Sequence, residues 1–181
     1  MGGMNILLHI CCAPCALYPY SRMKEEGLVP VGFFYNPNIH PYQEFNKRLE
    51  TVKEFSLRVG LDVQYRVGYD LDEFLVRTAG TGGLRCEYCY RMRLDEAAAA
   101  ARDKGFSAFT TSLLYSKYQK HDLIMGIGKE TASEYGVEFY YEDFRRGWRE
   151  GIVESRAMGL YRQQYCGCIY SELERYGKLK K

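Results

Sequence analysis

The stretch Met4-Asn5-Ile6-Leu7-Leu8-His9-Ile10-Cys11-Cys12-Ala13-Pro14-Cys15 sets the expected architecture. Its apolar first half, Met4 to His9, is typical of a buried strand in a parallel sheet. Ligands of such sheets bind beyond the carboxyl ends of the strands, near a switch in strand order. At that position this chain carries three thiols, and it contains neither a Gly-rich nucleotide fingerprint nor a Walker sequence. The stretch therefore favours thiol chemistry over ATP-dependent chemistry.

The rest of the chain alternates strand-like and helix-like segments. Further strands are predicted at 31–35, 62–67, 106–112 and 137–141, and helices at 16–26, 42–59, 70–76, 87–104 and 121–135. Alternation of this kind predicts an α/β fold with a parallel five-stranded sheet and helices on both faces. From Asp143 onward we expect short helices and loops, which gives a short helical C-terminal segment. We expect residues 1–181 to form a single α/β domain.

Composition narrows the class of protein. The 181 residues are 46% hydrophobic and carry a formal net charge of +2, so no global basic field indicates nucleic acid. No apolar run reaches the roughly 20 residues that span a bilayer. The N-terminus lacks the basic and long apolar regions of a signal peptide. We therefore expect a cytoplasmic protein without a membrane partner, in which an odd count of seven cysteines serves metal or redox chemistry.

All seven cysteines lie in three tight clusters, which are Cys11-Cys12-Ala13-Pro14-Cys15, Cys86-Glu87-Tyr88-Cys89 and Cys166-Gly167-Cys168. Thiolate ligation of a metal or an iron–sulfur centre requires such clustering, because several sulfurs must reach one centre. Dithiol–disulfide chemistry favours the same pattern. The second cluster begins a predicted helix, whose N-terminus stabilises thiolates. Nearby Arg85, Arg91 and Arg93 add positive charge that suits an electron-rich cluster.

The adjacent pair Cys11-Cys12 is awkward for a zinc site, whose ligands usually stand two to four residues apart. The two sulfurs can each reach a different iron of one cubane, so with Cys86 and Cys89 they provide four thiolates for a 4Fe–4S cluster. Zinc bound by four cysteines is the main inorganic alternative. The pair Cys166 and Cys168 suits a strained, easily reduced disulfide. Alternatively, this pair ligates a second metal beside the cluster, with Cys15 or a carboxylate helping.

Two further side chains are candidates for proton chemistry. His9 ends the first strand just before the thiols and could orient a cysteine or donate a proton. Asp143 follows the fifth strand and could act as an acid, with a helix cap as the equal alternative. The chain also carries cations that could form a local basic patch, namely Arg91, Arg93, Lys117, Lys120, Arg145, Arg146 and Arg149.

Four motifs together resemble those of the cobalamin-independent epoxyqueuosine reductases. They are His9-x-Cys11-Cys12-Ala13-Pro14-Cys15, Arg85-Cys86-x-x-Cys89-Tyr90-x-x-Arg93-Leu94, Thr110-Thr111-Ser112-Leu113 and Tyr161-Arg162-Gln163-Gln164-Tyr165-Cys166-Gly167-Cys168-x-Tyr170-Ser171. The resemblance covers nearly the whole chain. It implies a fold like that of the adenine nucleotide alpha-hydrolases, the HUP class. It also implies tRNA modification in queuosine biosynthesis, by an oxidoreductase that removes the epoxide oxygen of epoxyqueuosine in the anticodon loop.

Carried over by motif, the resemblance implies that Cys11, Cys12, Cys86 and Cys89 hold a 4Fe–4S cluster. It also implies that Cys166 and Cys168 form a redox-active pair and that a second iron is associated with the cluster. Spacing does not assign the ligands of this iron, for which Cys15, Cys166 and Cys168 are the candidates. The partners are the modified tRNA and an electron donor. Two other functions stay open, namely a sulfur-transfer tRNA-modifying enzyme of the same fold and a zinc-stabilised RNA-binding module without catalysis. The first would need an ATP-phosphate loop after the first strand, and the second predicts a colourless protein.

Overall fold

A computed structural model describes residues 3–177 and shows a five-stranded parallel sheet in the order β3-β2-β1-β4-β5. This arrangement confirms the predicted fold class. The strands are β1 (Asn5–His9), β2 (Val29–Phe34), β3 (Val63–Tyr65), β4 (Ala108–Thr111) and β5 (Glu138–Phe139). The chain passes from β1 outward to β3 and then crosses to β4 on the other side of β1. The strand order therefore switches between β1 and β4, where a ligand crevice is expected at the carboxyl edge.

The central strand β1 is where the sequence pattern is clearest. Ile6, Leu7 and Leu8 are completely buried because β1 has a neighbour on each side and helices above and below. Its last residue, His9, pairs with Phe33 of β2 and Thr111 of β4. The register brings the loops after β1 and β4 to the same edge of the sheet.

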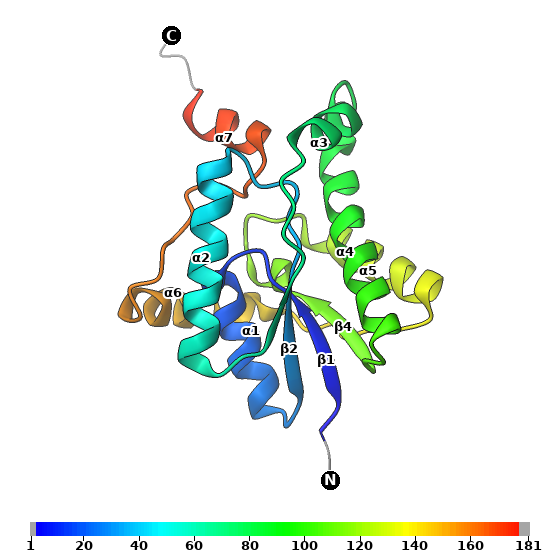
Figure 1. The fold of residues 1–181 in the computed structure, drawn as a ribbon, viewed down its shortest axis with the longest axis vertical. Helices are drawn as coiled ribbons and strands as arrows, with labels where there is room; N and C mark the ends of the chain where they lie inside the picture. Colours follow the sequence, from blue (N-terminus) through cyan, green and yellow to red (C-terminus); the bar gives the residue numbers. More distant parts are fainter. Residues whose placement is uncertain (1–2, 178–181) are drawn as a thin grey trace.

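Two helical layers cover the sheet, with α1 and α2 on one side and α4 and α5 on the other (Figure 1). α2 is amphipathic, and its buried residues include Phe45, Leu49, Val52 and Phe55. α7 lies at the end of the molecule reached by the N-terminal end of α2 (Figure 1). The helices are α1 (Ala13–Glu25), α2 (Tyr42–Val59), α3 (Leu71–Thr78), α4 (Arg85–Asp103), α5 (His121–Tyr135), α6 (Trp148–Ala157) and α7 (Ile169–Tyr176), with 3-10 turns η1 (Gly82–Leu84), η2 (Ser112–Tyr115) and η3 (Phe144–Gly147).

Element boundaries differ from the prediction where they affect the cysteines. α1 begins at Ala13 and not at Ala16, because a proline is tolerated in the first helical turn. Cys15 therefore belongs to a helix, not to the preceding loop. The edge strands β3 and β5 are shorter than predicted, since each pairs on one side only. Within the described residues, no helix combines the length and apolarity that crossing a membrane takes.

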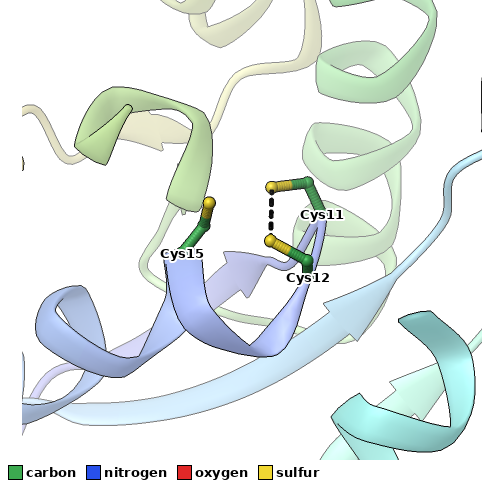
Figure 2. A group of neighbouring side chains, drawn as sticks. All are labelled: Cys11, Cys12 and Cys15. Carbon is green, nitrogen blue, oxygen red and sulfur yellow. Dashed lines mark hydrogen bonds between the residues drawn. The ribbon is translucent and has the colours of Figure 1, made fainter. Parts of the chain in front are cut away.

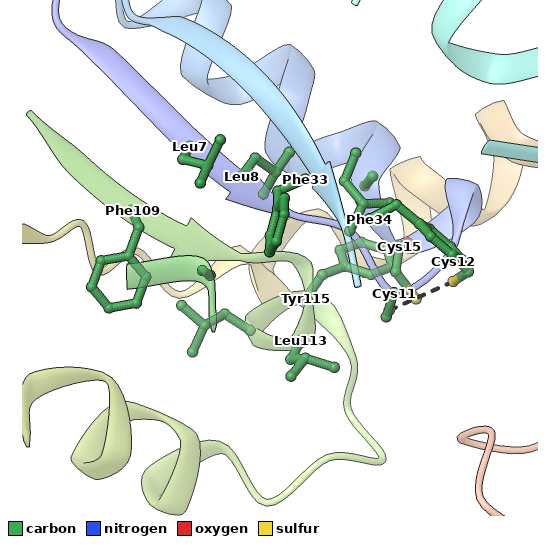
Figure 3. Packing of buried hydrophobic residues seen from close by; sticks show 14 of the residues in the cluster. Leu7, Leu8, Cys11, Cys12, Cys15, Phe33, Phe34, Phe109, Leu113 and Tyr115 are labelled. Atoms are coloured by element: carbon green, nitrogen blue, oxygen red, sulfur yellow. Dashed lines mark hydrogen bonds between the residues drawn. The ribbon is translucent and has the colours of Figure 1, made fainter. Parts of the chain in front are cut away.

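The apolar core continues up to the carboxyl edge of the sheet. Phe33, Phe34 and Leu113 belong to the same core cluster as Cys11, Cys12 and Cys15, and Figure 3 shows the three cysteines at one end of the residues drawn. The cysteines are thus held by packed neighbours and not by a surface loop. Rigid packing of this kind keeps side chains in fixed relative positions.

The packing of α5 against β5 supplies a test of the fold. A Cβ added at Gly128 would lie 2.4 Å from the Phe139 ring, whereas one added at Gly126 on the same helix meets nothing within 4 Å. We expect Gly128→Ala to lower the free energy of unfolding by about 1–3 kcal/mol through overpacking. Gly126→Ala should instead raise it by about 0.5–1 kcal/mol through better helix propensity. Urea unfolding of both variants measures the difference, and equal effects would contradict this packing.

Candidate active site

Three buried thiols meet at the carboxyl end of β1. The sulfurs of Cys11, Cys12 and Cys15 all lie within 4.8 Å of one another, and those of Cys11 and Cys12 are 3.8 Å apart (Figure 2). Cys11 and Cys12 come from the loop after β1, and Cys15 comes from the first turn of α1. In residues 3–177 this is the one group of three or more cysteine, histidine or carboxylate ligand atoms at such spacing. The trio is placed to bind one metal centre.

Polar neighbours distinguish the three thiols. The pKa of Cys11 is lowered, because hydrogen bonds from Cys12, Cys15 and Ser112 stabilise its thiolate. Ser112 lies at the start of η2, and its hydroxyl oxygen is 3.4 Å from the Cys11 sulfur. The Gln163 side-chain amide donates to Cys15 at 3.3 Å. Burial, followed by the hydrogen bond to Cys11, raises the pKa of Cys12. The polar neighbours therefore shift the pKa values of Cys11 and Cys12 in opposite directions.

Cys89 lies beside a buried arginine. The Arg93 guanidinium donates to the Cys89 sulfur at 3.3 Å and to the Cys89 carbonyl at 2.9 Å, one helical turn away on α4. Burial raises the pKa of the Cys89 thiol to about 11, although Arg93 opposes this shift. The charge of Arg93 also acts on Cys11 and Cys166. The positive charge of Arg93 therefore interacts with one cysteine from each of the three clusters.

The third cluster forms a short loop before α7. The Cys166 and Cys168 sulfurs are 3.9 Å apart, with Cys166 exposed and Cys168 buried. Cys168 packs with Cys89 and Phe74 in a small apolar cluster, so the second and third cysteine clusters adjoin. Gly167 has φ +133°, a conformation that side chains rarely adopt, and an added Cβ would lie 3.1 Å from Arg48. A glycine is therefore required between the two thiols.

Arg48 of α2 holds this loop in place. It is 1% exposed, and it donates to the carbonyls of Tyr165 and Cys166 at 3.0 Å each and to the Glu44 carboxylate at 2.7 Å. Burial opposes its charge, but the charges of Cys12 and Glu44 raise its pKa. Sequence reasoning missed Arg48. Its position three residues after Phe45, on the apolar stripe of α2, was the available signal, because a charged side chain on that stripe must be buried and paired.

His9 is completely buried and both of its ring nitrogens have partners. Nε2 lies 3.1 Å from the Tyr35 carbonyl, and Nδ1 lies 2.9 Å from the Thr111 hydroxyl. A carbonyl only accepts, which assigns the proton to Nε2. Burial, with the charge of Arg93, lowers the pKa of His9 to about 4. The neutral ring therefore links β1 to the loop after β2 and to β4 directly behind Cys11.

Asp143 serves as the cap of η3. Its carboxylate accepts from the Arg145 backbone at 3.1 Å and from the Arg145 guanidinium at 2.7 Å through both oxygens. The hydrogen bond from the Arg145 side chain lowers the pKa of Asp143 to about 2. The capping alternative considered for Asp143 is thus realised in the structure.

The structure brings the predicted residues together in two groups. Cys11, Cys12 and Cys15 form the buried trio, whereas Cys89 adjoins Cys168 and is linked to the trio through the charge of Arg93. Cys15 does not share its 4.8 Å group with Cys166 or Cys168 in the described part of the chain. Thiolates flanked by the buried cations Arg48 and Arg93 fit an anionic iron–sulfur group, because the arginines balance charge that burial would otherwise penalise.

Comparison with known proteins identifies relatives that match nearly the whole chain. The family model described as Epoxyqueuosine reductase QueH matches residues 6–174. A protein named epoxyqueuosine reductase QueH from Dehalococcoides mccartyi is 38% identical, over 96% of this chain and 96% of its own length. A protein of the same name from Thermotoga maritima is 37% identical, over 96% of this chain and 93% of its own length.

Solved structures share the fold at low sequence identity. A predicted subunit of a tRNA methyltransferase from Methanocaldococcus jannaschii superposes with a TM-score of 0.61 at 10% identity, covering 84% of this chain and 74% of that chain. The U34-tRNA thiolase NcsA from Methanococcus maripaludis, solved with its 4Fe–4S cluster, gives 0.58 at 14% identity, covering 94% and 62%. Both matches support the HUP-like fold that the sequence predicted.

Proposed function

The chain belongs to the epoxyqueuosine reductase QueH family, an oxidoreductase family, and from this premise we propose that it removes the epoxide oxygen of epoxyqueuosine in tRNA at a thiol-bound iron–sulfur cluster. The observation that carries this proposal is the buried trio of thiols at the switch point of the sheet. A thiolase of the same fold holds a 4Fe–4S cluster, which supports the cofactor assignment.

We assign Cys11, Cys12, Cys86 and Cys89 as the ligands of the 4Fe–4S cluster. A second iron nearby is the alternative role for Cys166 and Cys168, with Cys15 as a further candidate ligand. When bound, the iron–sulfur group supplies electrons one at a time, and an open iron polarises an oxygen of the substrate. Arg48 and Arg93 contribute fixed positive charge beside these thiols, which favours the electron-rich site.

The Cys166 and Cys168 pair fits the electron balance of the reaction. Conversion of an epoxide to an alkene consumes two electrons and two protons and releases water. Two thiols that join as a disulfide release the same two electrons and two protons. Exposed Cys166 can meet an external reductant, whereas Cys168 faces the cluster side through its contact with Cys89. We therefore propose that this pair relays reducing equivalents from an electron donor.

The remaining site residues act by positioning in this proposal. His9 holds β1 against its neighbours behind Cys11, and Asp143 orients Arg145 at the same edge of the sheet. We place all of this in one α/β domain and in the cytoplasm, where the tRNA substrate is available.

The function is tested with anaerobically reconstituted protein, a low-potential reductant and tRNA carrying epoxyqueuosine. Mass spectrometry of the digested nucleosides should show loss of one oxygen and appearance of queuosine. Protein loaded with zinc alone is the control and should leave the nucleoside unchanged. An intact iron–sulfur cluster without any loss of oxygen would count against the proposed function.

Serine substitution separates the redox pair from the cluster ligands. We expect Cys166→Ser and Cys168→Ser to keep the iron and sulfide content of the native protein but to lose multiple turnover, because one thiol cannot close a disulfide. Iron analysis and a turnover time course measure the two effects. Ser171→Ala, which alters a neighbour of Cys168 but no thiol, is the control and should keep multiple turnover. Loss of iron in either cysteine variant would make the pair a metal ligand set.

A further inference from the structure

An exposed aromatic pair is formed by Tyr118, in the loop before α5, and Trp148, the first residue of α6. Tyr118 is 84% exposed, and its ring meets the half-buried Trp148 edge-on, with the ring centres 5.6 Å apart. Behind them, Tyr115 lies 5.2 Å from Trp148, and its hydroxyl donates to the Trp148 carbonyl at 3.1 Å. We call Tyr118 and Trp148 the aromatic platform. Its outer ring, Tyr118, is accessible, and its inner ring, Trp148, is held by the buried Tyr115.

The platform is connected to the thiol site. Tyr115 ends η2, the same 3-10 turn whose first residue, Ser112, contacts Cys11. Figure 3 shows Tyr115 at the same end of the core as the cysteine trio. The charges of Cys15 and Cys12 also act on the Tyr115 hydroxyl. One short segment, η2, therefore joins the platform to the cysteine trio.

The seven cations of the predicted basic patch differ in their burial and in whether they form ion pairs. Arg145 is paired with Asp143, Arg91 is paired with two glutamates, and Arg93 is buried. The remaining four cations are exposed and make no ion pair within residues 3–177. They lie within three residues of Tyr118 or Trp148 in the sequence, and they are Lys117, Lys120, Arg146 and Arg149. Lys117 also lies over the Trp148 ring at 5.9 Å. Two exposed acids, Asp122 and Glu150, lie beside them in the sequence.

We propose that the aromatic platform, with Lys117, Lys120, Arg146 and Arg149, is the surface that docks the anticodon loop of the tRNA. The inference rests on the proposed function and names the surface by which the substrate is recognised. Single-stranded loops are bound by stacking unpaired bases on aromatic rings while cations contact the phosphates. The open face of Tyr118 matches a base, and the unpaired cations match the backbone. Phosphate contacts position the loop and the stacked base fixes its depth.

Trp148 is the only tryptophan of the chain, so its fluorescence reports on the platform directly. We expect an unmodified anticodon stem–loop RNA to quench this emission when it binds the anaerobically purified protein. Tyr118→Ala should weaken binding of the RNA by roughly tenfold, as loss of one base–aromatic stack does. Lys117→Glu combined with Arg149→Glu should weaken binding and reduce the salt slope by about 0.7 for each lost phosphate contact.

Matched controls lie elsewhere on the molecule. Leu57→Ala removes a side chain that is equally exposed, at 84%, and Lys24→Glu reverses an exposed charge on α1. Both should leave the RNA affinity within twofold of native, an order-of-magnitude bound for surface changes. Heparin, which has charge but no bases, should compete without quenching Trp148.

The outcomes separate this inference from the proposed function. Normal deoxygenation together with unchanged RNA affinity in the Tyr118 and cation variants would overturn the docking surface and leave the function intact. Quenching of Trp148 by an acidic electron-transfer protein, with none by RNA, would also overturn it in favour of a donor site. If the native protein binds the RNA at this surface but does not deoxygenate epoxyqueuosine, the proposed function is refuted and the docking surface is not.

Discussion

Replacing Cys11 with alanine is expected to remove the iron–sulfur group and to abolish the reduction of epoxyqueuosine. Hydrogen bonds from neighbouring side chains stabilise the thiolate form of Cys11. The positive charge of Arg93 also acts on Cys11. The loss of activity should exceed the roughly 10–100-fold that follows removal of an outer partner of a metal ligand. Iron and sulfide analysis, visible absorption and the deoxygenation assay measure the effect.

Ser112→Ala provides the matched comparison, since it removes the hydroxyl that contacts Cys11 and leaves every thiol in place. That variant should retain the cluster and lose about 10–100-fold in activity or cofactor affinity. Cys15→Ala then tests the ligand set. If Cys15→Ala loses the cluster and Cys86→Ala keeps it, the trio rather than the assigned four residues holds the iron–sulfur group. Cys11→Ala protein with native iron and sulfide would refute the assignment of Cys11.

The second large effect is expected from Arg48→Met. Methionine fills much of the buried volume but leaves the Glu44 carboxylate without its cation and the Tyr165 and Cys166 carbonyls without their donor. Removing one partner of a buried ion pair costs about 3–5 kcal/mol. We expect a fall of that size in the free energy of unfolding, measured by urea titration of metal-free, reduced protein.

Two further variants test whether the loss of stability comes from the buried ion pair. Lys53→Met removes a cation from an exposed pair with Glu50 on the same helix, so it should cost no more than about 1 kcal/mol. The double variant Arg48→Met with Glu44→Met removes both buried charges and should recover part of the loss. A double variant as unstable as the sum of its single variants would show that the two side chains do not interact.

Much of the fold was predictable from local sequence. Alternating apolar runs and amphipathic segments determine strands and helices over short distances, so α2 was predicted with its observed bounds, Tyr42–Val59. The three cysteine clusters were equally visible, because each is a contiguous stretch. Boundaries were less predictable where two signals compete, as at Ala13, where a proline that often ends a helix instead starts one.

The sequence by itself determined the α/β class, the clustering of the cysteines and the family of the chain. Only the tertiary structure decided which thiols share a group, which cations stay unpaired and what holds the loop that carries Cys166 and Cys168. Arg48 and Cys166 are 118 residues apart, and their hydrogen bond forms because α2 packs beside the loop before α7. No local pattern encodes such a contact, since it depends on how separate elements bury their apolar faces together. Charge burial and pairing follow from that packing, and with them the electrostatics of the site.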